Sequence, residues 1–133
     1  GAKMLFDEEN IYEEPMVKDL FGKGTLWKGK ADIINHSSRV IVDLKTTSNI
    51  DNFSYAARTY NYDSQAYIYK ELFGYEMKFF VIEKGTLRSK IVEVSDETLQ
   101  RGRDKAMEAE INYQDMFVAK KTNPQNFIEY GII

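Results

Sequence analysis

Apolar and polar positions alternate in a way that predicts a hairpin in the first third of the chain. Thr25–Ile34 and Arg39–Thr46 are rich in apolar and β-branched residues, which is typical of strands. The segment between them, Asn35–Ser38, is polar throughout and therefore indicates a turn. A four-residue turn at these positions would pair Ile34 with Arg39. We therefore expect two antiparallel strands here.

The rest of the pattern predicts a mixed order of strands and helices. Further strands are expected at residues 10–17, 77–83 and 87–94, where apolar residues alternate or run together. A helical stretch is expected after the cap-type residues at 48–51, with a break near Tyr60 and a stop at Gly74. Ser95 is expected to cap a long helix over residues 96–120.

The last helix carries an apolar stripe at helical spacing. We expect this stripe to face the sheet, and its members are Leu99, Ala106, Ala109, Tyr113 and Phe117. The same helix contains a basic run that we interpret as a solvated face, formed by Arg101, Arg103 and Lys105.

The hairpin would bring three charged side chains together. Side chains alternate along a strand, so Asp43 and Lys45 share a face. In the expected register Asp32 lies opposite Ile41 and diagonal to Asp43, roughly 7–8 Å away. Two neighbouring carboxylates resist ionisation unless a positive charge lies between them, and their hard oxygens suit magnesium or manganese. The alternative interpretation is two solvated strand ends with Lys45 as a surface cation.

The helical stretch after the hairpin adds polar candidates. Gln65 and Tyr69 are four residues apart and share one helix face, with Tyr62 one turn earlier. The tyrosines alone fit a core-facing aromatic stripe. Gln65 fits that interpretation poorly, because a buried amide needs hydrogen-bond partners.

Together these residues resemble the core of the PD-(D/E)xK nucleases. Asp32 and, after a short hairpin, Asp43-Leu44-Lys45 are similar to the family pattern, with Ala31 in place of its usual proline. Gln65-x-x-x-Tyr69 resembles the QxxxY motif of the RecB-like branch. The amino-acid sequence of this region is most similar to that of the RecE-type exonucleases of phages and prophages, and the resemblance covers residues 27–83.

The resemblance implies a fold and a site. The fold would be an α/β, restriction-endonuclease-like core of three layers, with a central mixed sheet flanked by helices. Asp32 and Asp43 would bind Mg²⁺ or Mn²⁺ together with the Leu44 carbonyl. Lys45 would be the catalytic lysine, while Gln65 and Tyr69 would border the site and contact the metal-bound water or the DNA backbone.

The resemblance also implies an activity and partners. The chain would be a metal-dependent exodeoxyribonuclease that resects the ends of double-stranded DNA in recombination, beside a strand-annealing protein. A homo-oligomeric ring of subunits is a further implication. Such a ring would hold DNA with little positive charge, which fits the net charge of −3 and the pI near 5.3. Local charge and metal-bridged phosphates would then supply the DNA affinity.

One departure from the family concerns the upstream ligand. Members of this branch carry a further acidic or histidine ligand on an earlier helix, whereas residues 1–31 here indicate strand and turn. We interpret residues 1–133 as a single nuclease core domain that lacks the N-terminal helices. His36 is interpreted as a solvated turn residue rather than a replacement ligand, and Glu13 and Glu14 are weaker candidates to line the site.

Composition narrows the class of protein. At 133 residues, with 43% hydrophobic and 29% charged residues, the chain fits one soluble globular domain. Zero cysteines exclude disulfides and zinc–thiolate sites and fit a cytoplasmic location. No apolar run approaches the ~20 residues of a membrane span.

Two alternative functions follow from what the sequence lacks. The missing upstream ligand is compatible with a catalytically inactive DNA-binding or assembly module, a truncated prophage remnant. A nuclease of the CRISPR-adaptation type shares the QxxxY helix, but that family clusters cysteines and this chain has none.

Overall fold

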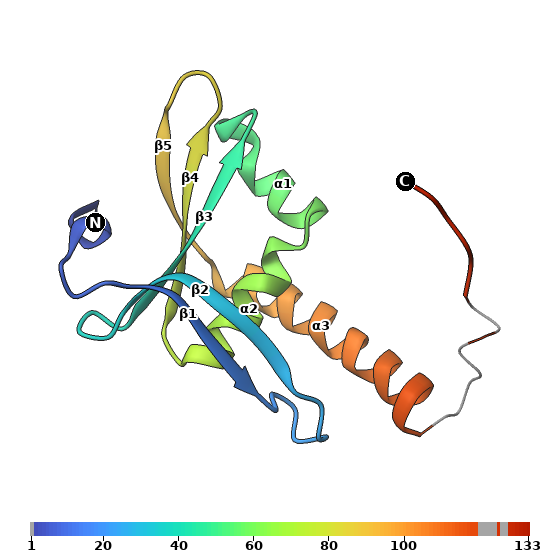
Figure 1. Ribbon diagram of the computed structural model, residues 1–133. Helices are drawn as coiled ribbons and strands as arrows, with labels where there is room; N and C mark the ends of the chain where they lie inside the picture. Colours follow the sequence, from blue (N-terminus) through green and yellow to red (C-terminus); the bar gives the residue numbers. More distant parts are fainter. Residues whose placement is uncertain (1, 120–124, 126–127) are drawn as a thin grey trace.

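The structure is a computed structural model that describes residues 2–119, 125 and 128–133 (Figure 1). Its strands are β1 (Ile11–Lys18), β2 (Trp27–Asn35), β3 (Val40–Thr47), β4 (Glu76–Glu83) and β5 (Ser89–Glu93). Its α-helices are α1 (Phe53–Thr59), α2 (Tyr62–Phe73) and α3 (Asp96–Tyr113). Short helical turns occupy Ala2–Phe6 and Ile50–Asn52, and a π-helical turn follows α3 at Gln114–Val118.

The five strands form one mixed sheet in the order β1-β2-β3-β4-β5. Neighbouring strands are antiparallel except β3 and β4, which run parallel. A parallel pair needs a crossover connection, and α1 and α2 provide it between β3 and β4. The predicted order of elements and an α/β fold around a central mixed sheet are therefore confirmed.

The three α-helices pack on one face of the sheet (Figure 1). The main core forms between them and the strands, around Ile34, Ile41 and Val81. On the opposite face a smaller cluster of Ile33, Val40 and Val42 packs against Met4 and Leu5 of the first helical turn. Within the part of the chain that the structure describes, no helix is long and apolar enough to cross a membrane.

Local sequence signals set several element ends. Ser95 accepts a hydrogen bond from the Thr98 amide at the start of α3, which is the expected N-cap. Gly74 ends α2 with a φ of 72°, a left-handed conformation that glycine adopts without strain. Asn61, also left-handed at φ 61°, separates α1 from α2 at the predicted break.

The predicted hairpin forms, but with a different register. Asn35 pairs with Val40 and Ile34 with Ile41, so the loop is residues 36–39 rather than Asn35–Ser38. Asn35 extends the strand because its buried amide has partners: it donates to Asn10 and accepts from the Ser38 backbone amide. The predicted pairing of Ile34 with Arg39 is wrong by two residues, and a shift of two residues leaves Ile34 on the same face as Ile41, as predicted.

The interpretation of the basic run on α3 is wrong for two of its three members. Arg101 and Lys105 form ion pairs of 2.8 and 2.9 Å with the fully buried carboxylate of Asp63 on α2. Arg103 is exposed, as expected. Gly102 allows this close docking, because a Cβ on it would lie only 2.0 Å from the Asp63 carbonyl oxygen.

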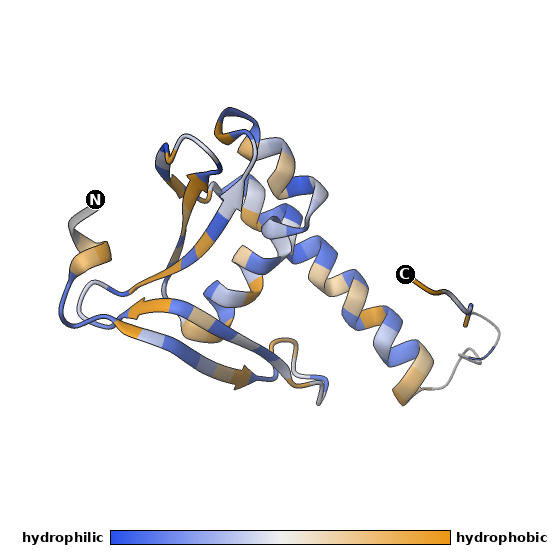
Figure 2. Cartoon of the chain, turned by 45° about the horizontal axis from the view of Figure 1, so that its top comes forward, coloured by the Kyte–Doolittle hydropathy of each residue, from blue (hydrophilic) through white to orange (hydrophobic). Residues whose placement is uncertain are grey.

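The apolar stripe of α3 is also only partly buried. Ala106 is buried and Leu99 packs against the main core, whereas Ala109, Tyr113 and Phe117 are exposed. The reason is that α3 packs mainly on α2, and its far end extends beyond the sheet (Figure 2). The regular α-helix ends at Tyr113, and the predicted end at Lys120 lies outside the described residues.

Candidate active site

The ladder between β2 and β3 opens where the predicted acids lie. Backbone pairing is present from Asn35 to Ile33, and continuing it sets Asp32 directly across from Asp43 rather than diagonal to it. At this point the Asp32 carboxylate, not a backbone carbonyl, accepts the Leu44 amide at 2.8 Å. The N–H and C=O of one strand residue point to the same side, so the Leu44 carbonyl also faces the opened gap beside Asp32.

A local irregularity in β2 contributes to this opening. Ala31 and Ile34 both belong to the helix-side core although they are three residues apart, which strict strand alternation does not allow. The β1–β2 pairing skips Asp32 and its neighbour Glu13, and Glu13 has a left-handed φ of 59°. The alternation of residues in β2 does not indicate this irregularity.

Asp43 is the buried carboxylate of the site. Its Oδ1 accepts a hydrogen bond from the Gln65 side chain at 3.0 Å. Its Oδ2 lies 2.9 Å from the Lys45 ammonium, but it has no aligned hydrogen-bond partner among the described residues. Burial raises the pKa of Asp43 from 3.8 to about 6; the Lys45 ammonium opposes the rise, and the Asp32 carboxylate adds to it.

Lys45 is held between the carboxylate and an aromatic ring. Its ammonium lies 4.4 Å from the centre of the Tyr62 ring, within the range of a cation–π contact. Tyr62 in turn packs against Phe53 and Phe79 of the core. The core-facing interpretation of Tyr62 is therefore compatible with a role beside the site.

Gln65 and Tyr69 have different surroundings although they share one face of α2. Gln65 contacts Asp43 directly, whereas the Tyr69 hydroxyl accepts the Lys30 backbone amide at 3.4 Å. The Tyr69 ring lies over Gly29, where a Cβ would come within 2.6 Å of it. Sequence reasoning missed Gly29, and a glycine within a strand was the signal for this close approach.

The other sequence candidates make their contacts with residues outside the acid pair. His36 is exposed in the hairpin loop, with its Nδ1 hydrogen-bonded to the Tyr75 hydroxyl at 2.7 Å. Glu13 forms an exposed ion pair with Lys30. Glu14 lies in β1 and pairs with Ala31.

The donor set of the acid pair suits a divalent cation. It offers two carboxylates, one with a buried oxygen that lacks an aligned donor, and a backbone carbonyl turned to the same gap. Such hard oxygen ligands are those of Mg²⁺ and Mn²⁺. Over residues 2–119, 125 and 128–133, no group of three or more His, Cys, Asp or Glu side chains is gathered for metal binding.

This chain matches the model of a known protein family and has the fold of several solved structures. The model of a family described as "PDDEXK-like domain of unknown function (DUF3799)" matches residues 9–128. A crystal structure of a proposed exonuclease from Eubacterium rectale superposes with a TM-score of 0.67 and 24% identity, over 90% of this chain and 52% of that protein. A search of curated proteins found no match.

Two other solved structures have the same fold. The protein SSO0001 gives a TM-score of 0.53 at 16% identity, over 81% of this chain and 54% of its own length. A phage-related exonuclease from Haemophilus somnus gives 0.53 at 15% identity, over 85% of this chain and 63% of its own. The chain thus spans between half and two thirds of these structures.

The family match and the fold point to the same group of proteins. The match covers residues 9–128, which include β1 to β5, all three α-helices and the acid pair. The solved structures share this arrangement over most of the chain. The chain therefore belongs to the PDDEXK-like domain family, within the PD-(D/E)xK nuclease superfamily.

Proposed function

We propose that this domain is a nuclease that hydrolyses DNA phosphodiester bonds with the help of a divalent cation. One observation carries the proposal. The buried Asp43 carboxylate meets the Asp32 carboxylate and the Lys45 ammonium at an opened strand pair. A buried acid with a raised pKa beside a second acid is costly to the fold, and such costs cluster at functional sites.

Asp32, Asp43 and the Leu44 carbonyl are the groups that would hold the cation, and we propose Mg²⁺ or Mn²⁺. A bound divalent cation lowers the pKa of its water and stabilises the charge that develops on phosphorus. Gln65 fixes the Asp43 carboxylate through Oδ1 and leaves Oδ2 facing Lys45 and the gap. The hydrogen bond from the Lys30 amide to the Tyr69 hydroxyl connects β2 to α2, the helix that also carries Gln65.

The Lys45 ammonium supplies N–H donors to the site. Its ammonium is fixed by Asp43 on one side and by the Tyr62 ring on the other. As an ammonium, Lys45 is placed to orient the attacking water, and its charge offsets that of the two acids. It could deprotonate that water only as the neutral amine, after giving up a proton of its own. Fixed geometry of this kind lowers the cost of organising the reaction.

The proposed substrate is the end of a linear DNA duplex. The RecE-type resemblance of residues 27–83 and the two exonuclease designations among the solved structures support an exonuclease. We extend the proposal to resection during recombination beside a strand-annealing protein, with the subunits assembled in a ring. Light scattering of the purified protein tests the ring directly, since a monomeric mass contradicts it.

The activity is tested with linear duplex DNA in magnesium or manganese. We expect the wild type to degrade the duplex and Asp43→Ala to lose more than about 100-fold of the rate, because metal ligands matter more than their supporting partners. Asp104→Ala, an exposed acid on α3, is the matched control and should retain the rate. No cleavage by wild type in either metal contradicts the proposal.

A second function has one observation in its favour. Only two carboxylates meet at the site within the described residues, which would suit an inactive DNA-binding or assembly module. Calorimetry with manganese separates the two functions. A nuclease site should bind manganese with an affinity that collapses in Asp32→Ala, whereas an inactive module should show no such dependence.

A further inference from the structure

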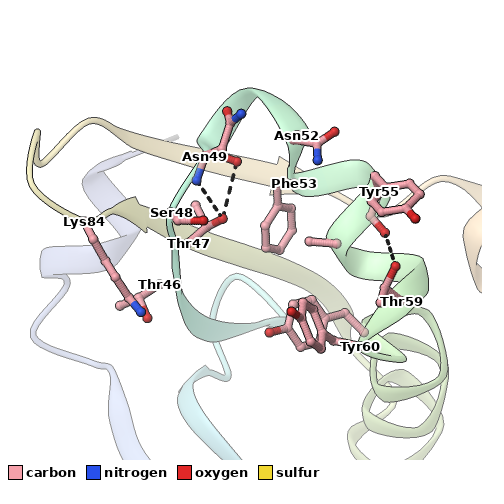
Figure 3. Close-up of a pocket in the computed structure, with 12 residues that line it drawn as sticks. Thr46, Thr47, Ser48, Asn49, Asn52, Phe53, Tyr55, Thr59, Tyr60 and Lys84 are labelled. Atoms are coloured by element: carbon pink, nitrogen blue, oxygen red, sulfur yellow. Dashed lines mark hydrogen bonds between the residues drawn. The ribbon is translucent and has the colours of Figure 1, made fainter.

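A groove with a volume of about 420 Å³ lies at the end of β3, next to the acid pair. Figure 3 shows its walls: Thr46 and Lys84 lie on one side, and Tyr55 and Thr59 lie on the other. Tyr60 also lines the groove and lies at the bottom of the same view. The proposed catalytic roles use none of these residues.

Tyr62 joins the groove to the site. It lines the groove, and its ring carries the Lys45 ammonium at 4.4 Å from its centre. Lys45 in turn is paired with Asp43. Tyr62 therefore belongs both to the groove and to the surroundings of Lys45.

A series of neighbouring aromatic rings leads from the core to solvent. Phe53 and Tyr62 are stacked with their ring centres 5.7 Å apart, and Tyr60 continues the series at 6.0 Å from Tyr62. Tyr60 is 66% exposed and Tyr55, which also lines the groove, is 67% exposed. Open ring faces beside a groove are platforms on which nucleic-acid bases stack.

The polar part of the groove is fixed in place. The buried Glu83 accepts the Ile50 amide at 2.8 Å, and the Lys84 amide donates to the Thr47 carbonyl at 2.9 Å. Arg88 and Asp51 form a two-point ion pair between the β4–β5 turn and the loop after β3. These bonds fix the backbone of Lys84 at the rim before any ligand arrives, and such preorganisation reduces the cost of binding.

We propose that this groove binds unpaired deoxynucleotides of the strand whose phosphate lies at Asp43 and Lys45. The bases would stack on Tyr60 and Tyr55, and the Lys84 ammonium would contact a backbone phosphate. Aromatic faces combined with a cation are the recognition chemistry of single-stranded DNA. The inference rests on the proposed function, because the acid pair defines which strand enters the groove.

Binding is measured separately from hydrolysis. The probe is a fluorescent oligothymidylate of about eight nucleotides, titrated with the full chain in calcium and followed by anisotropy. We expect Tyr60→Ala to raise the Kd between about 5- and 100-fold, the range for loss of one stacked base. Tyr60→Phe keeps the ring and should stay close to wild type. Tyr113→Ala, an exposed tyrosine on α3, is the matched control.

The outcomes separate this inference from the nuclease proposal. An unchanged Kd in both Tyr60→Ala and Tyr55→Ala overturns the groove assignment, even if the enzyme cleaves DNA. The assignment is also overturned if Tyr113→Ala raises the Kd as much as Tyr60→Ala does. The same holds if Tyr60→Ala raises the Kd for a blunt hairpin duplex as much as the Kd for the oligothymidylate. A wild type that binds the probe through Tyr60 but cleaves nothing supports the groove and contradicts only the nuclease. Circular dichroism of each variant confirms that the fold is intact.

Discussion

Asp43 and Asp63 are both buried aspartates on neighbouring elements, β3 and α2, yet their surroundings are opposite. Asp63 is contacted by Arg101, Lys105 and the Ser64 amide, which together satisfy both of its oxygens. Asp43 has one ammonium that is poorly aligned, one amide donor and a second carboxylate nearby.

The pKa values move in opposite directions for this reason. Burial by itself raises the pKa of Asp63, but hydrogen bonds from Lys105, Arg101 and the Ser64 amide outweigh it and lower the pKa below 3.8. Burial dominates at Asp43 and raises its pKa to about 6. The satisfied acid, Asp63, joins α2 to α3. We propose that the unsatisfied acid, Asp43, takes part in the active site. Buried groups without full partners are therefore informative about function.

The largest effect on stability is expected from removing the satisfied acid. Asp63→Ala leaves Arg101 and Lys105 without their buried partner and loosens α2 on α3. Breaking a buried ion pair in this way costs about 3 kcal/mol of unfolding free energy, measured by urea denaturation. Asp104→Ala on the exposed face of α3 should change it by less than about 0.5 kcal/mol. Equal losses of unfolding free energy in the two variants would contradict a structural role for Asp63.

Replacing the unsatisfied acid, Asp43, should change the unfolding free energy in the opposite direction. In chelator at pH 7, Asp43→Asn replaces a carboxylate whose ionised form is disfavoured, since its pKa is raised to about 6. We expect the unfolding free energy to rise by about 1–3 kcal/mol, because each pKa unit corresponds to about 1.4 kcal/mol. Asp51→Asn, an exposed acid paired with Arg88, serves as control and should give no gain. A loss of stability in Asp43→Asn contradicts the contrast between the two acids.

The smallest effect is a pH dependence specific to Asp63. Its lowered pKa stabilises the fold at pH values above 3.8, and this contribution is lost as the pH falls through the lower pKa of the folded state. The difference in unfolding free energy between wild type and Asp63→Asn should therefore narrow as the solution is acidified below 3.8. A constant difference across that range shows that the Asp63 carboxylate contributes no charge-dependent stability.

The local parts of the fold could be predicted from the sequence because their causes are local. Ser95 caps α3 and Gly74 ends α2 through hydrogen bonds and backbone freedom that involve only nearby residues. The hairpin strands follow from their alternating apolar residues. Asp43 and Lys45 share a face because side chains in a strand repeat every second residue.

The errors concern contacts between distant segments. The hairpin register depends on Asn10, which lies 25 residues before Asn35 and provides its buried partner. The basic residues of α3 appear solvated until Asp63, 38 and 42 residues earlier, is placed beneath them. Tyr113 and Phe117 fit a core stripe by spacing, but the sheet does not extend under that part of α3. None of these partners is marked by the local pattern.

The order of residues is enough to establish an acid, a second acid with a lysine two residues later, and a glutamine on the following helix. The folded chain is needed to show that the β2–β3 ladder opens at Asp32, that Gln65 reaches Asp43, and that Asp63 is satisfied while Asp43 is not. Burial and charge pairing depend on segments far apart in the chain, whereas alternation and capping depend on neighbouring residues.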